Sequence, residues 1–85
     1  MGLASHLTRD GEAMSTALAV ADRIAANGPL AVRNIKASVM AALELREDEA
    51  FQRELELGME VMASKDAKEG PRAFLEKRTP RFTGE

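Results

Sequence analysis

Apolar residues recur every three or four positions along most of this 85-residue chain, a spacing typical of amphipathic helices. Asp10 suits the N-cap of a first helix, which we expect to end near Asn27. Asn27 and Gly28 both tolerate a left-handed helix stop, and Pro29 suits the first position of the next helix. The apolar face of the first helix consists of Met14, Leu18, Ala21, Ile24 and Ala25.

Two further helices are predicted over residues 29–45 and 48–63. The charged run over residues 46–49 favours a helix start, because carboxylates are stabilised at the positive end of the helix dipole. Gly58 costs about 1 kcal/mol relative to Ala inside a helix, so close packing is expected there or the segment is weak. The apolar faces contain Ile35, Val39 and Leu43 in the second helix and Phe51, Leu55, Met59 and Met62 in the third.

A short last helix is predicted to begin at Pro71, whose missing N–H has no intrahelical partner at the first helical position. Ser64 or Asp66 caps the turn before it. Phe74 is the expected buried aromatic of this helix. Lys77 and Arg78 are expected in its last turn, where the helix dipole favours cations.

The composition favours a small helical domain with a thin core. Hydrophobic residues make up 45% of the chain and charged residues 31%, which excludes a disordered tail. A chain of this length buries only about 60% of the surface that its unfolded form exposes, so its independent stability is small. We predict an all-α fold of about four helices after a short extended stub over residues 1–7, with residues 1–85 forming one helical domain.

Charge and cysteine content narrow the function classes. The net charge of −2 disfavours nucleic acid and anionic membranes as partners, so any anion site must be local. The absence of cysteine is compatible with a reducing compartment, and we expect a cytoplasmic protein. His6 is the only histidine and has no second ligand at metal-binding spacing, so no metal site is predicted.

Phe74 and Lys77 are the candidate binding residues. They are three positions apart, which places an aromatic ring and an ammonium on one helix face, where both can border the same pocket. The structural alternative is an ordinary capped C-terminal helix, in which Arg78 donates hydrogen bonds to the last carbonyl groups of the helix.

The order and spacing of four short motifs closely resemble those of the crotonase superfamily of enoyl-CoA hydratases and isomerases, and most specifically the C-terminal end of its members. The motifs are GLA at residues 2–4 followed by DG at 10–11, IAANGPLAVRNIK at 24–36, SKDAKEG at 64–70, and AFLEKR at 73–78 followed by PRFTG at 80–84. Together they extend over nearly the whole chain. In this family the passage around residues 1–7 leaves a larger upstream domain, so the resemblance implies that the chain is a fragment or a truncated form.

The resemblance implies a role in subunit assembly, as trimers or hexamers, and in completing an acyl-CoA pocket. At the matching places of the AF-x-EKR motif, Phe74 would lie near the adenine of coenzyme A and Lys77 would meet a phosphate. Coenzyme A would enter as a thioester substrate, with no prosthetic group. The parent reaction implied is hydration of 2-enoyl-CoA thioesters in fatty-acid metabolism, with isomerisation or another CoA thioester reaction as an alternative.

No catalytic residue is assigned within the chain. In the family, the two catalytic glutamates and the two oxyanion-hole N–H groups lie on upstream loops that these 85 residues do not contain, so we expect no activity from this chain alone. Two rival readings remain. One is a stand-alone helical interaction module without CoA binding, and the other is a helix-turn-helix nucleic-acid binder at the corner of residues 27–29, which the net charge disfavours.

Overall fold

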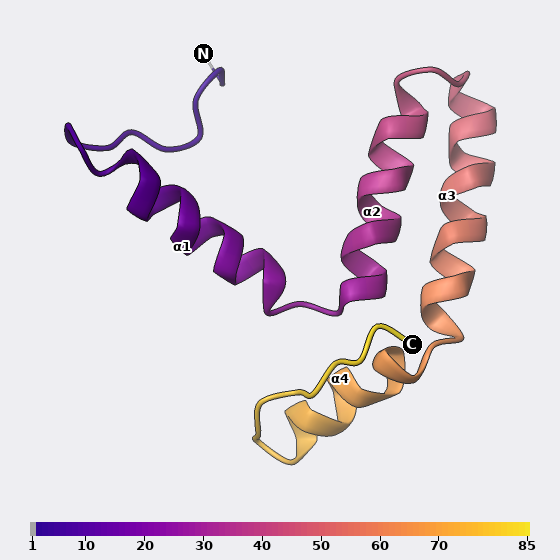
Figure 1. Ribbon diagram of the computed structural model, residues 1–85. Coiled ribbons are helices and arrows are strands. Elements are labelled where there is room, and N and C mark those ends of the chain that lie inside the picture. Colours follow the sequence, from indigo (N-terminus) through magenta and orange to yellow (C-terminus); the bar gives the residue numbers. More distant parts are fainter. Residues whose placement is uncertain (1) are drawn as a thin grey trace.

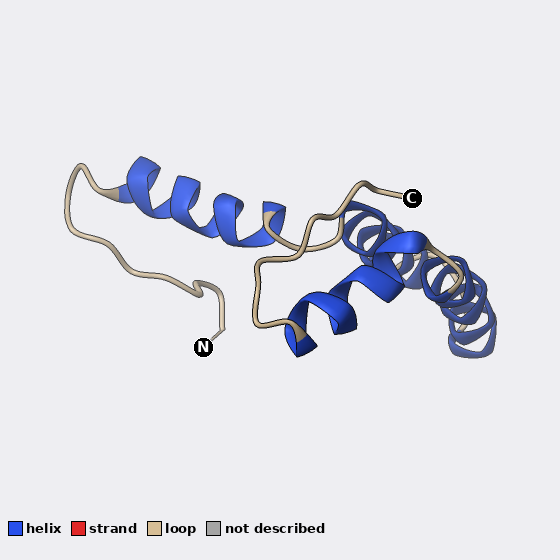
Figure 2. Ribbon diagram, turned by 90° about the horizontal axis from the view of Figure 1, so that it is seen from below, coloured by secondary structure: helices blue, strands red, loops and turns tan. Residues whose placement is uncertain are grey.

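The computed structural model describes residues 2–85, which form four α-helices and no strand (Figures 1 and 2). The predicted all-α fold is therefore confirmed. Residues 2–12 contain neither helix nor strand, and Met1, the first residue of the predicted stub, lies outside the described residues. The helices are α1 (Ala13–Ala25), α2 (Pro29–Ala42), α3 (Glu47–Met62) and α4 (Lys65–Leu75).

Helices α2 and α3 form an antiparallel hairpin, from which α1 diverges and below which α4 lies (Figure 1). The Asn34 side-chain amide joins the two helices, because it donates hydrogen bonds to the Leu57 carbonyl and to the Glu60 carboxylate, both at 3.0 Å. Leu57 is buried in this hairpin. Figure 1 shows α1 extending away from α2, and Met14 and Leu18 of α1 are exposed.

The helix starts follow from local capping. Pro29 occupies the first turn of α2 as predicted. At the start of α3, the Glu49 carboxylate accepts a hydrogen bond from the Arg46 backbone N–H at 3.3 Å. Ser64 caps α4, because its hydroxyl accepts a hydrogen bond from the Ala67 N–H at 3.1 Å. Of the two predicted caps, Ser64 is therefore the one used.

Two predictions about α1 are wrong. Asp10 does not cap it, because Gly11 adopts a left-handed turn with φ of 81° and the helix begins only at Ala13. The predicted left-handed stop is absent too, since Gly28 has φ of −59°. Instead the Asn27 side-chain amide donates to the last carbonyl groups of α1, to that of Arg23 at 2.9 Å.

The predicted start of the last helix at Pro71 is also wrong. Pro71 lies inside α4, which begins six residues earlier. An interior proline removes one helix hydrogen bond and costs roughly 3 kcal/mol. The Ser64 cap and the hydrogen bonds that Asp66 and Glu69 make to the C-terminal residues offset that cost. Consequently Lys77 and Arg78 lie just beyond the helix and not in its last turn.

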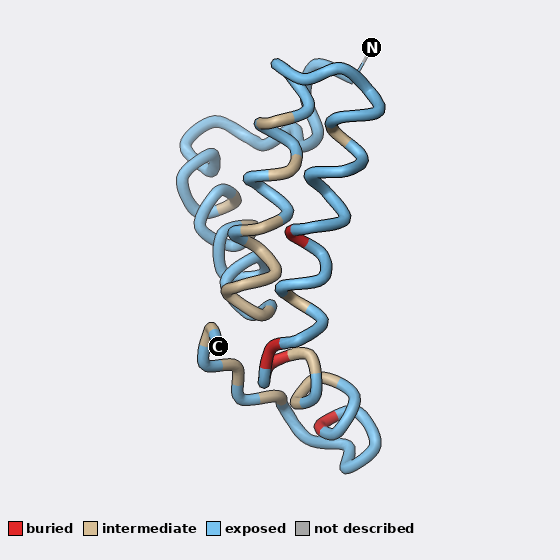
Figure 3. The backbone as a smooth tube through the Cα atoms, turned by 90° about the vertical axis from the view of Figure 1, so that its right-hand side faces the viewer, coloured by how far each residue is buried: buried red, intermediate tan, exposed pale blue. Residues whose placement is uncertain are grey.

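The fold is open. Its radius of gyration is 16.2 Å, whereas a compact domain of this length has about 12 Å. The accessible surface is 7441 Å², about 2,500 Å² more than a compact monomer of this mass exposes. Figure 3 shows buried residues only near α3 and α4. The only buried apolar residues among those described are Leu57 and Ala73, so the thin core predicted from composition is confirmed.

Candidate functional site

Lys77 occupies the left-handed position of a Schellman motif that ends α4. Its N–H donates to the Phe74 carbonyl at 3.2 Å, and the Arg78 N–H donates to the Ala73 carbonyl at 3.0 Å. The φ of Lys77 is 53°, and among residues 2–85 no other non-glycine residue has a positive φ. Because glycine usually occupies this position, a lysine there carries a conformational cost of about 1 kcal/mol.

Phe74 is exposed, which contradicts the prediction of a buried aromatic. Its side chain is 82% accessible, whereas the neighbouring Ala73 is 1% accessible and faces the body of the fold. The aromatic residue that α4 does pack against is Phe82. A Cβ added at Gly28 would lie 3.8 Å from the ring, and one added at Gly70 would lie 3.9 Å from it, so the ring packs beside both glycines.

Arg78 is held by two carboxylates. Its guanidinium forms a fork on Glu69, with Nη1 to Oε1 at 2.6 Å and Nη2 to Oε2 at 3.2 Å, and its Nε bonds Glu76. The hydrogen bonds from Arg78 and from the Arg81 backbone N–H lower the pKa of Glu69 from 4.5 to about 2. The same two carboxylates raise the pKa of Arg78. The Arg78 side chain therefore does not donate to the last carbonyl groups of α4. Its backbone N–H does, to the Ala73 carbonyl.

Residues 79–85, here called the C-terminal tail, run back along α4 (Figure 2). The Asp66 carboxylate accepts the N–H groups of Thr83 and Gly84, both at 2.8 Å. The Glu69 carboxylate accepts the Arg81 N–H at 2.9 Å. The sequence reading gave Asp66 only the role of an alternative helix cap and missed that of Glu69, because a pairing with residues 12 to 18 positions away has no local signal.

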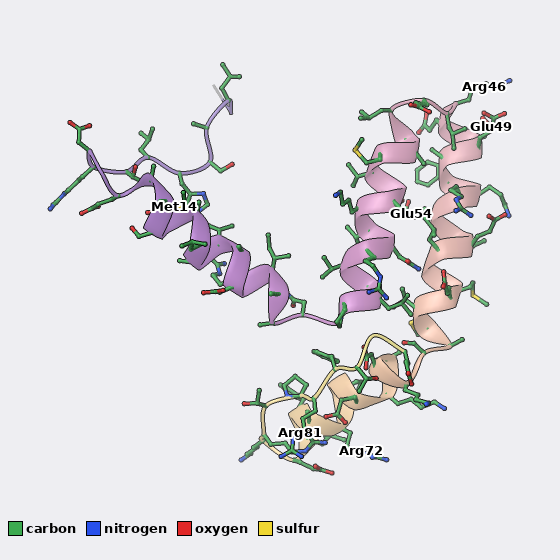
Figure 4. The ribbon with its side chains drawn as sticks, viewed as in Figure 1. Met14, Arg46, Glu49, Glu54, Arg72 and Arg81 are labelled. Atoms are coloured by element: carbon green, nitrogen blue, oxygen red, sulfur yellow. The ribbon has the colours of Figure 1, made fainter. Side chains whose placement is uncertain are left out.

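Cations gather where α4 ends. Figure 4 shows Arg72 and Arg81 at this end of the helix, beside the turn that contains Lys77 and Arg78. Both carboxylates that pair with Arg78 lie in the same region. No ion pair within residues 2–85 involves Lys77. Arg72 and Arg81 likewise form no ion pair with residues 2–85.

A second feature is an apolar groove of about 680 Å³ between α2 and α3. Glu54, labelled in Figure 4, lies at this groove. A Cβ added at Gly58 would meet no atom within 4 Å, so the close packing considered for that glycine is absent within the described residues. The apolar side chains of the groove include Ile35, Val39, Phe51, Leu55, Leu57, Met59, Val61 and Met62.

The described residues offer binding groups but no assembled catalytic set. Among residues 2–85, no three histidine, cysteine or carboxylate side chains are arranged to hold a metal ion. None of the helices described is long and apolar enough to cross a bilayer. His6, at the start of the chain, is exposed. The arrangement at the end of α4 can bind an anion beside an exposed ring, and the groove can receive apolar surface.

Comparison with known proteins places these features in a family. The family model described as enoyl-CoA hydratase/isomerase matches residues 1–85. The chain is 51% identical over 82 residues to the enoyl-CoA hydratase EchA19 of Mycobacterium tuberculosis, covering 96% of this chain and 31% of that protein. It is 38% identical over 87 residues to carnitinyl-CoA dehydratase of Proteus mirabilis, covering 98% and 33%.

Solved structures agree with the sequence comparison. The crystal structure of an enoyl-CoA hydratase from Mycobacterium tuberculosis H37Rv matches with a TM-score of 0.91 and 40% identity, covering 99% of this chain and 33% of that one. The chain spans about a third of the length of the curated relatives it matches. The predicted resemblance is confirmed, and this chain belongs to the enoyl-CoA hydratase/isomerase family, the crotonase superfamily.

Proposed function

We propose that residues 1–85 form the C-terminal helical domain of an acyl-CoA enzyme, where they mediate subunit assembly and complete the binding site for coenzyme A. The observation that carries the proposal is the end of α4. There an exposed phenylalanine and a lysine that forms no ion pair with residues 2–85 stand three residues apart, at a turn fixed by two backbone hydrogen bonds. A side-chain pair of this kind suits an aromatic base and a phosphate.

The role in assembly is supported by the exposed apolar surface. The excess of about 2,500 Å² on this one chain corresponds to roughly 5,000 Å² counted over both partners, the upper part of the range that permanent protein interfaces bury. Leu55 and Phe51 of the groove are 60% and 63% exposed, and Met14 and Leu18 of α1 are 72% and 57% exposed. Burying these side chains against the rest of the enzyme or against another subunit supplies the stability that the thin core lacks. A trimer, or a hexamer built from two trimers, is the assembly that we propose.

The role in binding assigns one contact to each residue. The Phe74 ring would lie against the adenine, and the Lys77 ammonium would meet a phosphate of the same nucleotide. Because the nucleotide end is far from the reacting carbons, these contacts stabilise the ground state and the transition state equally. Their loss is therefore expected to raise KM and to leave kcat nearly unchanged.

The proposed reaction is the hydration of a 2-enoyl-CoA thioester. The relatives include an enoyl-CoA hydratase and a carnitinyl-CoA dehydratase, both named for CoA thioester substrates. In such a reaction, backbone N–H groups stabilise the enolate-like transition state and carboxyl groups move the protons. We assign neither task to residues of this chain, so the purified 85-residue chain should not turn over crotonyl-CoA.

The proposal is tested in a full-length chimera, in which this chain replaces the matching third of the Mycobacterium tuberculosis EchA19. Lys77→Ala removes one charge-assisted contact worth about 1.5–3 kcal/mol at most, so KM for a CoA thioester should rise on the order of tenfold. Phe74→Ala should have a similar effect. Against a pantetheine thioester, which lacks the nucleotide, wild type and both variants should be almost indistinguishable.

The outcome against the proposal is equally clear. If Lys77→Ala weakened the full and the truncated thioester equally, the lysine would only shape the helix end. If neither variant changed KM and the chain bound other helices without any response to CoA, the stand-alone interaction module would be the better account.

A further inference from the structure

The two adjacent cations at the end of α4 have different environments. The Arg78 guanidinium is paired with Glu69 and Glu76, and its side chain is 35% exposed. Lys77 is exposed and forms no ion pair with residues 2–85. The positive charge of Arg78 is already balanced by these two carboxylates, so Arg78 is poorly suited to bind an external phosphate. The Lys77 ammonium has no such ion pair and is well suited to bind a phosphate.

Arg78 instead holds the backbone directly after Lys77. Its N–H bonds the Ala73 carbonyl at 3.0 Å, while its side chain grips Glu69, whose carboxylate is only 17% exposed. Glu69 also accepts the Arg81 N–H at 2.9 Å. One carboxylate on the body of α4 thus holds the residue directly after Lys77 and a residue three positions further along the tail.

The fork of Arg78 on Glu69, here called the clamp, acts next to a residue in an unfavourable backbone conformation. Lys77 has φ of 53°, which a lysine does not adopt without support from the surrounding structure. Without the clamp, only the two backbone hydrogen bonds to the Phe74 and Ala73 carbonyls hold this turn, so it relaxes more readily to an ordinary right-handed or extended conformation. The Cα–Cβ bond of Lys77 would then point in a different direction, and the ammonium would move with it.

We propose that Arg78 is a positioning residue: its fork on Glu69 holds Lys77 in the left-handed conformation that directs the ammonium to the nucleotide phosphate. This inference rests on the proposed function, because it takes the phosphate contact of Lys77 as its target. It adds that Arg78 and Glu69 act on CoA only through Lys77.

The experiment is a double-mutant cycle in the full-length chimera, with KM measured for a CoA thioester and for the matching pantetheine thioester. Arg78→Lys keeps the positive charge but loses the fork. It should raise KM for the CoA thioester about three- to tenfold and leave both kcat and the pantetheine KM unchanged. In a Lys77→Ala background the same change should have no further effect, because the residue through which it acts is gone.

A second variant guards against a folding defect. Glu69→Gln keeps an acceptor for the Arg81 N–H and removes the charge that Arg78 grips, so it should reproduce the KM effect of Arg78→Lys and its dependence on Lys77. Additive effects of Arg78→Lys and Lys77→Ala would mean that Arg78 meets the phosphate itself, which would overturn the inference. A lower melting temperature without a change in KM would also overturn it, because Arg78 would then be purely structural.

The proposed function fails in a different way. If Lys77→Ala alone left KM unchanged for the CoA thioester, Lys77 would not contact the nucleotide. The positioning role proposed for Arg78 would then be rejected as well. If Lys77→Ala raised KM but Arg78→Lys and Glu69→Gln did not, the proposed function would stand and only the positioning role would be rejected.

Discussion

Replacing Asp66 with alanine should release the C-terminal tail from α4. The Asp66 carboxylate is 8% exposed and accepts the N–H groups of Thr83 and Gly84, each at 2.8 Å. No other side chain of residues 2–85 accepts a hydrogen bond from these two amides. The Asp66 N–H also donates to the Glu85 carbonyl, but this bond does not depend on the side chain.

The size of the effect follows from these two hydrogen bonds. A hydrogen bond to a charged group contributes about 1.5–3 kcal/mol net, and each 1.4 kcal/mol is a factor of ten. Amide hydrogen exchange at Thr83 and Gly84 should therefore accelerate roughly 10- to 150-fold in Asp66→Ala. The Phe82 ring would still lie against Gly28 and Gly70, which limits how far the tail can move.

Exchange is measured residue by residue in the full-length chimera, with two matched controls. Asp66→Asn keeps one acceptor oxygen, so one of the two amides should remain protected. Lys65→Ala removes an ion pair with Glu85 whose side chains are 81% and 67% exposed, and such pairs contribute at most about 1 kcal/mol, so exchange should change less than about fivefold. Equal exchange in Asp66→Ala and in wild type would refute the reasoning.

Three further predictions concern the end of α4 and the groove. Lys77→Gly removes the conformational cost of the left-handed backbone, about 1 kcal/mol, so the melting temperature of the chimera should rise by about 2–4 °C. The KM for the CoA thioester should also rise, because the ammonium is lost. A fall in melting temperature would contradict the strain assigned to Lys77. Folding lowers the pKa of Glu69 from 4.5 to about 2, so the ion pair with Arg78 stabilises the fold fully above pH 4.5. This stabilisation is lost as the pH falls through about 2. An NMR titration of Glu69 should therefore show a midpoint near 2, which moves toward 4.5 in Arg78→Met. Leu55→Asp places a charge in the apolar groove and should disperse the assembly in sedimentation experiments, whereas Gln52→Asp on the outer face of α3 should not; equal behaviour of the two variants would argue against the groove as an interface.

The helices could be predicted because their signals are local. The three- to four-residue apolar spacing located α2 and α3 to within three residues of their ends. The Ser64 cap was visible for the same reason. The start of α4 was predicted wrongly because a proline in a helix is most often found in the first turn. Here Pro71 lies in the interior of the helix, where contacts from the C-terminal tail support it.

The details of the site could not be predicted because they depend on contacts between distant parts of the chain. The burial of an aromatic was assigned to Phe74, yet the ring that packs is Phe82, which reaches Gly28 more than fifty residues earlier. The left-handed conformation of Lys77 has no sequence signal, since a glycine is the usual mark of that position. The family resemblance identified the two candidate residues, and the fold supplied the turn that holds them.

The central claim, that the end of α4 contacts the nucleotide of coenzyme A, is tested most directly by photo-crosslinking. A CoA thioester with a photoreactive azide on its adenine is irradiated with the full-length chimera, and the adducts are located by mass spectrometry. We expect labelling within residues 73–78, abolished by excess unlabelled CoA and not by the pantetheine thioester. Labelling confined to the two thirds of the chimera that come from the relative would contradict the claim.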